Sequence, residues 1–407
     1  MRLARDRPFF GWWVAWTGFL MALFAWGLGF YGPGIYLLWL TRDHGWPVAG
    51  VSAAITLYYV ASAAIVFCAG DIFARLGHRR AVLGGVAALG TGALAMPLLT
   101  APWQAAAAFL VMAFGWAMLG SAGVNIVLAP WFERRRGMVV SLALNGASLG
   151  GVLIAPMIVL LAAAFGTTAA MAIAVFLMLM TLGVFAVLTL GGGPAERGLA
   201  PDGDTPQAAP TAAAPRATRR ALLGSWAFWS VAAPFALALQ AQVAVLTHQL
   251  ASLSLAMTAT QAAPVIALTG VMAVTGRLAT GLVVDRLDRR AVAAGNFVLQ
   301  AGALVLLVLA DSTALLWAGW LLFGLGVGNQ VTLSGLIVQV EFSRADFARV
   351  VGLVVAVAQV TYAFGPGAMG WLAAHGGYGQ GFGAAAAVLV LAAAIVLAGR
   401  PSRRVQL

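Results

Sequence analysis

Arg277 is the residue whose position in this sequence most needs a chemical explanation. It lies in the stretch VTGRLATGLVVDRLDRR, inside the apolar part and eight residues before Asp285. A helical rise of about 1.5 Å per residue places it roughly 12 Å from that aspartate, close to the middle of a membrane and beyond easy snorkelling reach. Insertion of an arginine at that depth costs roughly 2.5 to 3.5 kcal/mol of free energy, so its side chain should face a water-filled cavity or a polar partner.

The chemistry that Arg277 offers is anion binding. No Asp or Glu lies inside any apolar span, since every acidic residue falls in a loop, a terminus or at a helix end. The planar guanidinium matches a carboxylate in bidentate geometry. We therefore predict that Arg277 binds the carboxylate of a small organic anion. The alternative is a structural arginine bonded to backbone carbonyls.

The same residues bear on coupling to protons. Arginine does not deprotonate in proteins, and the spans contain no mid-membrane carboxylate or histidine to shuttle a proton. His248 and His375 lie at helix ends opposite the arginine-rich loops. Exchange or electrically driven uniport fits more simply than proton symport, although the anion could itself bring the proton.

Other polar residues near span midpoints could line the same cavity and orient a ligand. For each one alone, hydrogen bonding between helices is a somewhat better explanation. Cys68 is a lone thiol, and we expect neither a cofactor nor a metal site. The candidates beside Arg277 are Tyr31, Tyr59, Gln240, Asn329, Gln359 and Tyr362, with Tyr58, Gln242 and Gln330 next to them.

The elements that must position these residues are membrane-spanning helices. The chain is 62% hydrophobic and 9% charged over 407 residues, too apolar for a soluble domain. Apolar runs of about 20 residues suit helices that cross roughly 30 Å of hydrocarbon. The sequence therefore predicts an all-α integral membrane protein with twelve spans, over residues 11–39, 48–70, 81–101, 104–130, 138–164, 167–190, 223–248, 262–284, 291–310, 314–340, 349–373 and 378–399.

The arginines predict the orientation. All 23 basic residues are arginine, and 21 fall on one side when alternate loops are taken as cytoplasmic. Both termini are therefore expected in the cytoplasm. Their dispersal among loops excludes nucleic acid as a partner. Short loops suit a monomer in a bacterial inner membrane, with the lipid bilayer and a small carboxylate as partners.

A linker and an internal repeat divide the chain. Residues 191–220 hold five of the sixteen prolines and almost no large apolar side chain, so nothing there can drive packing. RRAVLGGVAALGTGALA from Arg79 matches RRAVAAGNFVLQAGALV from Arg289 at an offset of 210 residues. We expect two pseudo-symmetric six-helix bundles, residues 1–190 and 223–407, joined by a flexible cytoplasmic linker over 191–222.

The loop after the eighth span carries a family resemblance. GLVVDRLDRR, from Gly281, resembles the loop motif G-x-x-x-D-R-x-G-R-R of the major facilitator superfamily, with Asp288 in place of the second glycine. GDIFARLGHRR, from Gly70, is similar but degenerate. The resemblance implies a latch that holds one conformational state, whereas the alternative is that both loops only anchor the topology. The implied latch residues are Asp285, Arg286, Arg289, Arg290, Arg79, Arg80 and Asp71.

A narrower resemblance covers the whole chain. FFGWWVAWTGFL, RRRGMVVSLALNGASLGGVLIAP and GRLATGLVVDR look like the monocarboxylate transporter and oxalate:formate antiporter branch. There, the arginine similar in position to Arg277 binds the substrate carboxylate. The chain departs from the branch at Ala273, where the animal carriers have aspartate. It also departs in the predicted span 349–373, which offers Gln359 and Tyr362 in place of a cation. One cation favours a monocarboxylate over a dicarboxylate.

Two other functions stay open at this point. An efflux carrier of another small solute or drug would use the same fold with Arg277 in a structural role. An enzyme or sensor is disfavoured, because the spans hold no constellation of His, Cys, Asp and Glu and the chain has no soluble output domain.

Overall fold

A computed structural model describes residues 9–133, 135–203, 218–284, 286–343 and 346–399, and these residues form helices and no strand. Within these described residues, eleven helices are long and apolar enough to cross a membrane. The last of them, Arg349–Ala398, has 50 residues, about 75 Å of helix or more than twice the hydrocarbon thickness. Its chain turns at Gly377, where φ is 77°. It therefore crosses twice, and the predicted twelve spans are confirmed.

The contacts between Cα atoms divide the chain into two compact units, Met1–Pro33 with Ala61–Ala209, and Gly34–Val60 with Pro210–Leu407. The division into residues 1–190 and 223–407, made from the repeat, stays a prediction. The helices of the first unit are α1 (Gly11–Phe24), η1 (Ala25–Tyr31), α4 (Ala69–Ala95), η2 (Met96–Leu98), α5 (Pro102–Leu119), α6 (Ser121–Leu128), α7 (Arg136–Leu149), η3 (Gly150–Ile154), α8 (Ala155–Phe165), α9 (Thr167–Met178), η4 (Leu179–Gly183), α10 (Val184–Thr189), η5 (Ala195–Arg197) and η6 (Pro201–Gly203).

Glycines set the closest approach in the first unit. α1 packs on α7, where a Cβ at Gly146 would overlap the carbonyl oxygen of Phe19 and one at Gly150 would lie 2.5 Å from that of Leu23. Only a residue without a side chain permits this contact between two backbones. α4 packs on α5 in the same way.

The first part of the predicted linker is docked on the first unit. The backbone N–H of Asp202 donates to the Trp131 carbonyl at 2.9 Å, and its carboxylate accepts from the N–H groups of Glu133, at 3.0 Å, and Arg135, at 3.3 Å. Asp202 is 8% exposed. A charge-assisted polar contact thus holds a segment that lacks large apolar side chains. The rest of the linker, residues 204–217, lies outside the described residues.

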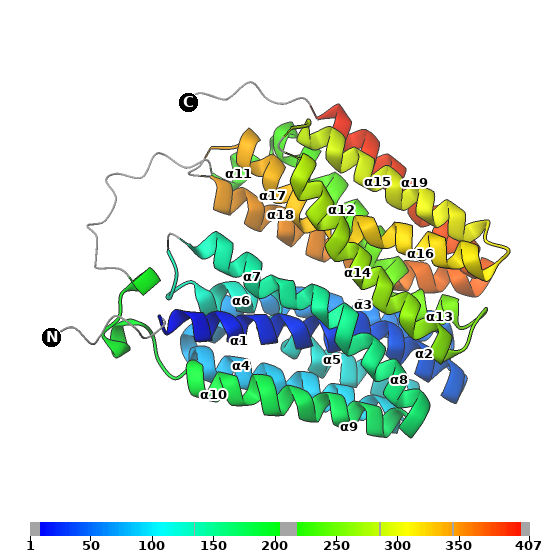
Figure 1. The fold of residues 1–407 in the computed structure, drawn as a ribbon, viewed down its shortest axis with the longest axis horizontal. Coiled ribbons are helices and arrows are strands. Elements are labelled where there is room, and N and C mark those ends of the chain that lie inside the picture. The colour runs from blue at the N-terminus through cyan, green and yellow to red at the C-terminus, as the bar shows by residue number, and fades with distance from the viewer. Residues whose placement is uncertain (1–8, 134, 204–217, 285, 344–345, 400–407) are drawn as a thin grey trace. The chain divides into compact units, whose positions relative to one another are not determined.

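The second unit contains the helices that carry most of the candidate residues. α12 packs on α18 and α19, α14 packs on α16, and α15 packs on α16 and α19, as the yellow-green to red helices of Figure 1 show. Their bounds, with those of the two helices contributed by the N-terminal part of the chain, are α2 (Gly32–His44), α3 (Val48–Phe67), α11 (Arg219–Leu223), α12 (Trp226–Thr247), α13 (Gln249–Leu253), α14 (Ala259–Val283), α15 (Arg289–Val308), α16 (Thr313–Val327), α17 (Asn329–Glu341), α18 (Phe347–Tyr362) and α19 (Gly365–Ala398).

The two copies of the loop motif use different turns. Gly77 has φ of 76°, a left-handed conformation that favours glycine. Asp288, which replaces the second glycine of the motif in the second copy, has φ of −61° and caps α15 by accepting a 2.8 Å hydrogen bond from the Ala291 N–H. The aspartate that departs from the motif is therefore a helix N-cap, for which its side chain is well suited.

Candidate functional site

Arg277 lies on α14, six residues before the helix ends at Val283. The side chain is half-buried, and its Nε donates a 2.9 Å hydrogen bond to the carbonyl oxygen of Gly328. Gly328 separates α16 from α17, so this carbonyl lies at a break in the tenth span. One of the five N–H donors of the guanidinium is thus fixed on the backbone of another helix, which orients the whole planar group.

Close packing of α14 on α16 brings the arginine to this carbonyl. A Cβ on Gly276 would overlap the Leu325 carbonyl oxygen, and one on Gly328 would overlap that of Ala273. Gly324 also lies close to Thr269, with its Cβ position 2.7 Å from the Thr269 carbonyl oxygen. Gly276, Gly324 and Gly328 therefore set the height at which Arg277 meets the tenth span.

A chain of amide hydrogen bonds continues from the break into the interior of the second unit. Asn329, the residue after Gly328, donates from Nδ2 to the Asn296 oxygen at 2.9 Å. Asn296 in turn donates from Nδ2 to the Gly326 carbonyl at 3.3 Å. Both side chains are buried. The amide nitrogen of Asn329 holds α15 and the break together, which fits the alternative role of interhelical bonding. Its predicted contact with a ligand stays a prediction.

Buried amide atoms without a partner surround the same region. In the part of the chain that the structure describes, these atoms are the side-chain oxygens of Gln242, Asn329 and Gln330 and both polar atoms of Gln300. Gln330 donates from Nε2 to the Ala238 carbonyl at 3.3 Å, so only its side-chain oxygen lacks a partner among the described residues. Such atoms are rare in native interiors, and each costs about 1–3 kcal/mol.

The candidate tyrosines separate into the two units. In the second unit, Tyr59 of α3 is fully buried and makes an edge-to-face contact with Tyr362 of α18, with ring centroids 5.4 Å apart. Tyr58 lies beside Tyr59, with a centroid distance of 4.7 Å. Tyr31 belongs to the first unit, where its ring lies against Gly151 of η3. Tyr59 and Tyr362, far apart in the sequence, are thus neighbours.

The two remaining candidate residues are half-buried glutamines of the second unit, Gln240 on α12 and Gln359 on α18. α12 and α18 pack on each other, and the Gln240 backbone carbonyl lies 2.7 Å from the Cβ position of Gly365, at the start of α19. Six of the seven predicted substrate residues, all but Tyr31, belong to this unit.

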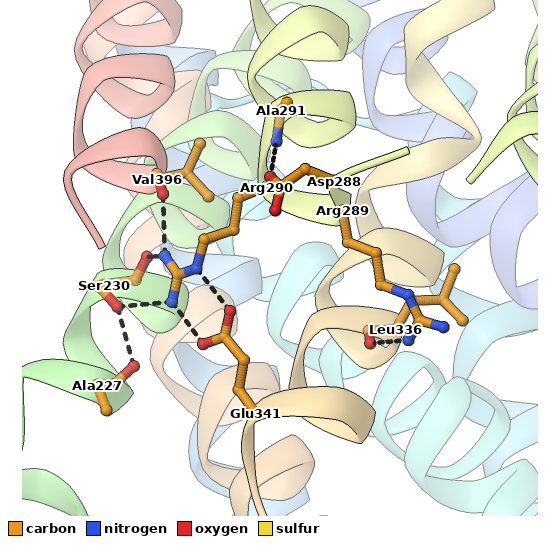
Figure 2. A network of polar contacts seen from close by, with 9 residues as sticks. All are labelled: Ala227, Ser230, Asp288, Arg289, Arg290, Ala291, Leu336, Glu341 and Val396. Atoms are coloured by element: carbon orange, nitrogen blue, oxygen red, sulfur yellow. Dashed lines mark hydrogen bonds and ion pairs between the residues drawn. The ribbon is translucent and has the colours of Figure 1, made fainter. Parts of the chain in front are cut away.

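The arginines of the second loop motif are bound to the ends of neighbouring helices. Arg290 is 4% exposed and meets the carboxylate of Glu341 in a bidentate pair, with Nε–Oε1 at 2.6 Å and Nη2–Oε2 at 2.7 Å. It also donates to the carbonyls of Ser230, at 3.2 Å, and Val396, at 2.9 Å, as Figure 2 shows. Arg289 points the other way and donates to the Leu336 carbonyl. Arg290 thus joins α12, α15, α17 and α19.

The first loop motif is different. Asp71, Arg79 and Arg80 are exposed. The position 210 residues before Glu341 is Trp131, so the first repeat has no acidic residue for Arg80 at the equivalent place. In the second loop, Arg286 is exposed, and Asp285 lies outside the described residues. The predicted role of Asp285 in the latch therefore stays a prediction.

Glu341 and Ser230 are the partners that the sequence did not single out. Glu341 is the last residue of an apolar span, a position typical of an acidic residue that simply ends a helix. One signal in the sequence could have found it. Glu341 is an acidic residue at the end of a span, in the same half of the chain as the arginine pair Arg289 and Arg290. Ser230 carries no signal, because its role depends on which helices become neighbours.

Comparison with known proteins agrees with this architecture. The sequence matches the Major Facilitator Superfamily over residues 15–341 and again over residues 248–406, and the chain belongs to that superfamily. It is therefore a multi-pass membrane transporter, as the loop motif predicted. No curated protein matches the sequence.

Two solved structures share the fold. Both are of a bacterial homologue of the human lysosomal transporter Spinster, in an inward-facing conformation. The occupied form is 12% identical, with a TM-score of 0.72 and 97% of each chain covered. The unoccupied form is 13% identical, with a TM-score of 0.71, covering 97% of this chain and 98% of that one. This likeness supports the fold, and the narrower branch stays a prediction.

Proposed function

We propose that this protein transports small organic anions, in particular monocarboxylates, by alternating access, with Arg277 binding the carboxylate. The observation that carries the proposal is the placement of Arg277. It is a permanently charged side chain within a span, half-buried, and oriented by its Nε bond to Gly328. A ligand carboxylate meeting the guanidinium would be linked through it to the break in the tenth span.

The charges of the spans support an anionic ligand. Within the described residues, the acidic side chains that fall in candidate spans lie within three residues of a span end, namely Asp43, Asp71 and Glu341. Because these acidic side chains lie at span ends, a cation inside a span favours an anion over a cation as cargo. Exchange or electrically driven uniport is the mode that these residues favour. We further propose a monomer in a bacterial inner membrane with both termini cytoplasmic.

The experiment is counterflow in liposomes. Purified protein is tested with labelled lactate, pyruvate, formate and related acids, with and without a pH gradient. We expect accumulation of at least one monocarboxylate, and its loss in Arg277→Gln. Arg277→Lys keeps the charge but not the planar fork, so we expect weakened transport. Arg219→Gln, at an exposed arginine outside both loop motifs, is the matched control. Transport by Arg277→Gln at the control rate would refute the proposal.

A second function is favoured by one observation, the hydrogen bond from Arg277 to a backbone carbonyl. In an efflux carrier of another small solute, this bond would be the whole role of the arginine. The two functions differ in a thermal-shift measurement, because a ligand that binds the native state raises its unfolding temperature. Carboxylates should stabilise the control and not Arg277→Gln, whereas a structural arginine leaves both equally unresponsive and lowers the stability of the variant.

A further inference from the structure

A histidine is buried where the α2–α3 hairpin packs on helices of the second half of the chain. His248 follows the last residue of α12 and is 0% exposed. Its Nε2 lies 3.3 Å from Oγ of Ser52 and 3.1 Å from the carbonyl oxygen of Pro366. Its Nδ1 lies 3.3 Å from the hydroxyl of Tyr378. The imidazole thus contacts α3 on one side and α19 on the other.

The partners determine the tautomer. A carbonyl oxygen can only accept, so Nε2 must carry the hydrogen that points to Pro366. Nδ1 then accepts from the Tyr378 hydroxyl. Neutral His248 therefore has a partner at each nitrogen. A second proton, on Nδ1, would reverse the bond to Tyr378 and leave its hydroxyl hydrogen to find another acceptor.

Small residues make the contact around His248 close. Ser52 packs on Gly370, and Thr56 of α3 accepts a 2.9 Å hydrogen bond from the Gly367 N–H. On the other side, a Cβ at Gly34 of α2 would overlap the carbonyl oxygen of Thr247. The hairpin comes from the first sequence repeat, and α12 and α19 come from the second. With the predicted bundles 1–190 and 223–407 rocking against each other, this contact has to open.

Among the described residues, no charged group hydrogen-bonds His248 to compensate a second proton. Of the titratable side chains on the elements around it, Tyr378 alone hydrogen-bonds the imidazole. Burial lowers the pKa of His248 to about 4, although the Pro366 carbonyl opposes the effect. The other titratable side chains on those elements are Tyr58 and Tyr59 of α3, Tyr36, Arg42, Asp43 and His44 of α2, and His375 of α19, and within α12 and α13 there is none.

We propose that His248 is a proton-binding site of this gate, neutral while the hairpin is packed on α12 and α19 and protonated once the hairpin has moved away. Acid on that side of the membrane then favours the open gate. With the orientation proposed above, that side is the outside of the cell. The proposal needs alternating access but not an anionic substrate.

The size of the effect follows from linkage. In the open gate, the solvated imidazole would regain its ordinary pKa of 6.5. Only the open form then gains protons as the pH falls toward 5.5. Between pH 7.5 and pH 5.5, the ratio of open to closed protein should rise about tenfold.

Electron paramagnetic resonance distances test this in the full chain, without any substrate. Spin labels are placed at His44→Cys and Leu255→Cys, both exposed, in a Cys68→Ser background. We expect the ratio of the long-distance population to the short-distance population to be about tenfold higher at pH 5.5 than at pH 7.5. In His248→Gln, which keeps an N–H donor for Pro366, the pH response should disappear. In His375→Gln, at an exposed histidine on the same helix as Tyr378, it should persist.

Two results would overturn the proposal. One is an unchanged distance distribution in the labelled background between pH 7.5 and pH 5.5, which needs no histidine variant and so cannot be blamed on misfolding. The other is a full response in His248→Gln. Because no anion is present, either failure leaves the substrate proposal to its own experiment.

Discussion

Arg290 and Glu341 form a bidentate ion pair with both side chains almost fully enclosed, 5% and 9% exposed. The remaining N–H donors of the arginine reach Ser230 and Val396, so every edge of the guanidinium has an acceptor. Desolvated pairs of this kind are costly to break, since removal of one partner leaves a buried charge. The pair ties α15 to α17 at the end of the second unit where the loop motif lies.

Glu341→Gln should therefore lower the free energy of unfolding by about 3–5 kcal/mol. The measurement is thermal unfolding in detergent, followed by tryptophan fluorescence. Asp311→Asn, at an exposed acid of the same unit, should change little. The double variant Arg290→Met with Glu341→Leu should be more stable than Glu341→Gln, because no charge stays buried. A double variant less stable than the single one would contradict this explanation.

Gly328→Ala should damage transport through packing. The added Cβ would overlap the Ala273 carbonyl and push α17 away from α14, at a cost of about 1–3 kcal/mol. The acceptor of Arg277 moves with it. Gly335→Ala is the matched control on α17, since no heavy atom lies within 4 Å of its Cβ position. Equal transport by the two variants would show that the contact of α14 with the break is dispensable.

Gln300→Met should leave stability unchanged or raise it. Gln300 is fully buried and neither side-chain polar atom has a partner, so the isosteric apolar residue removes a desolvation cost of about 1–3 kcal/mol. Asn296→Leu, one helical turn earlier, should destabilise, because Asn296 bonds both Gly326 and Asn329. Chemical or thermal unfolding compares the two. A loss in Gln300→Met would reveal a bound water or ligand at this amide.

Stability should depend on pH through His248. Its pKa falls from 6.5 to about 4 in the folded protein, so the neutral form is favoured by folding. This contribution is fully present above pH 6.5 and is lost as the pH falls from 6.5 toward 4, by up to about 3 kcal/mol. The difference in unfolding temperature between the wild type and His248→Gln should therefore shrink in acid. A difference that is constant from pH 7.5 to pH 4.5 would exclude a titrating His248.

Asp202→Ala should release the docked part of the linker. Without the carboxylate, the N–H groups of Glu133 and Arg135 lose their acceptor. We expect hydrogen exchange at these two amides to accelerate at least tenfold, with helices α4 and α5 unaffected. Asp71→Ala, at an exposed acid of the same unit, is the control. Unchanged exchange in Asp202→Ala would mean that another contact is sufficient to hold the segment, namely the Arg197 guanidinium, which lies 3.8 Å from the centroid of the Phe10 ring.

Much of the fold was predictable, and particular residues show where the prediction ends. The predicted spans begin and end within five residues of the helices, with two exceptions. The helix predicted to begin at residue 81 begins at Ala69, and the predicted spans 349–373 and 378–399 lie in one run, Arg349–Ala398, which turns at Gly377 without a polar loop. Asp288 was recognised as a departure from the loop motif, but not as a helix cap, because capping depends on the backbone angle at that residue. The linker was predicted as flexible throughout, yet Asp202 docks, since two backbone donors reach it from another loop.

The sequence by itself determined the class of protein, the number of spans, the loop motif of the superfamily and the confinement of acidic residues to loops, termini and span ends. These are local properties, because each span satisfies its own backbone hydrogen bonds and carries its own hydropathy. The tertiary structure alone decided that Arg277 hydrogen-bonds Gly328, that Glu341 forms an ion pair with Arg290 and that His248 is buried between α3 and α19. Such pairings join residues dozens to hundreds of positions apart, and they exist only once small residues let particular helices pack together.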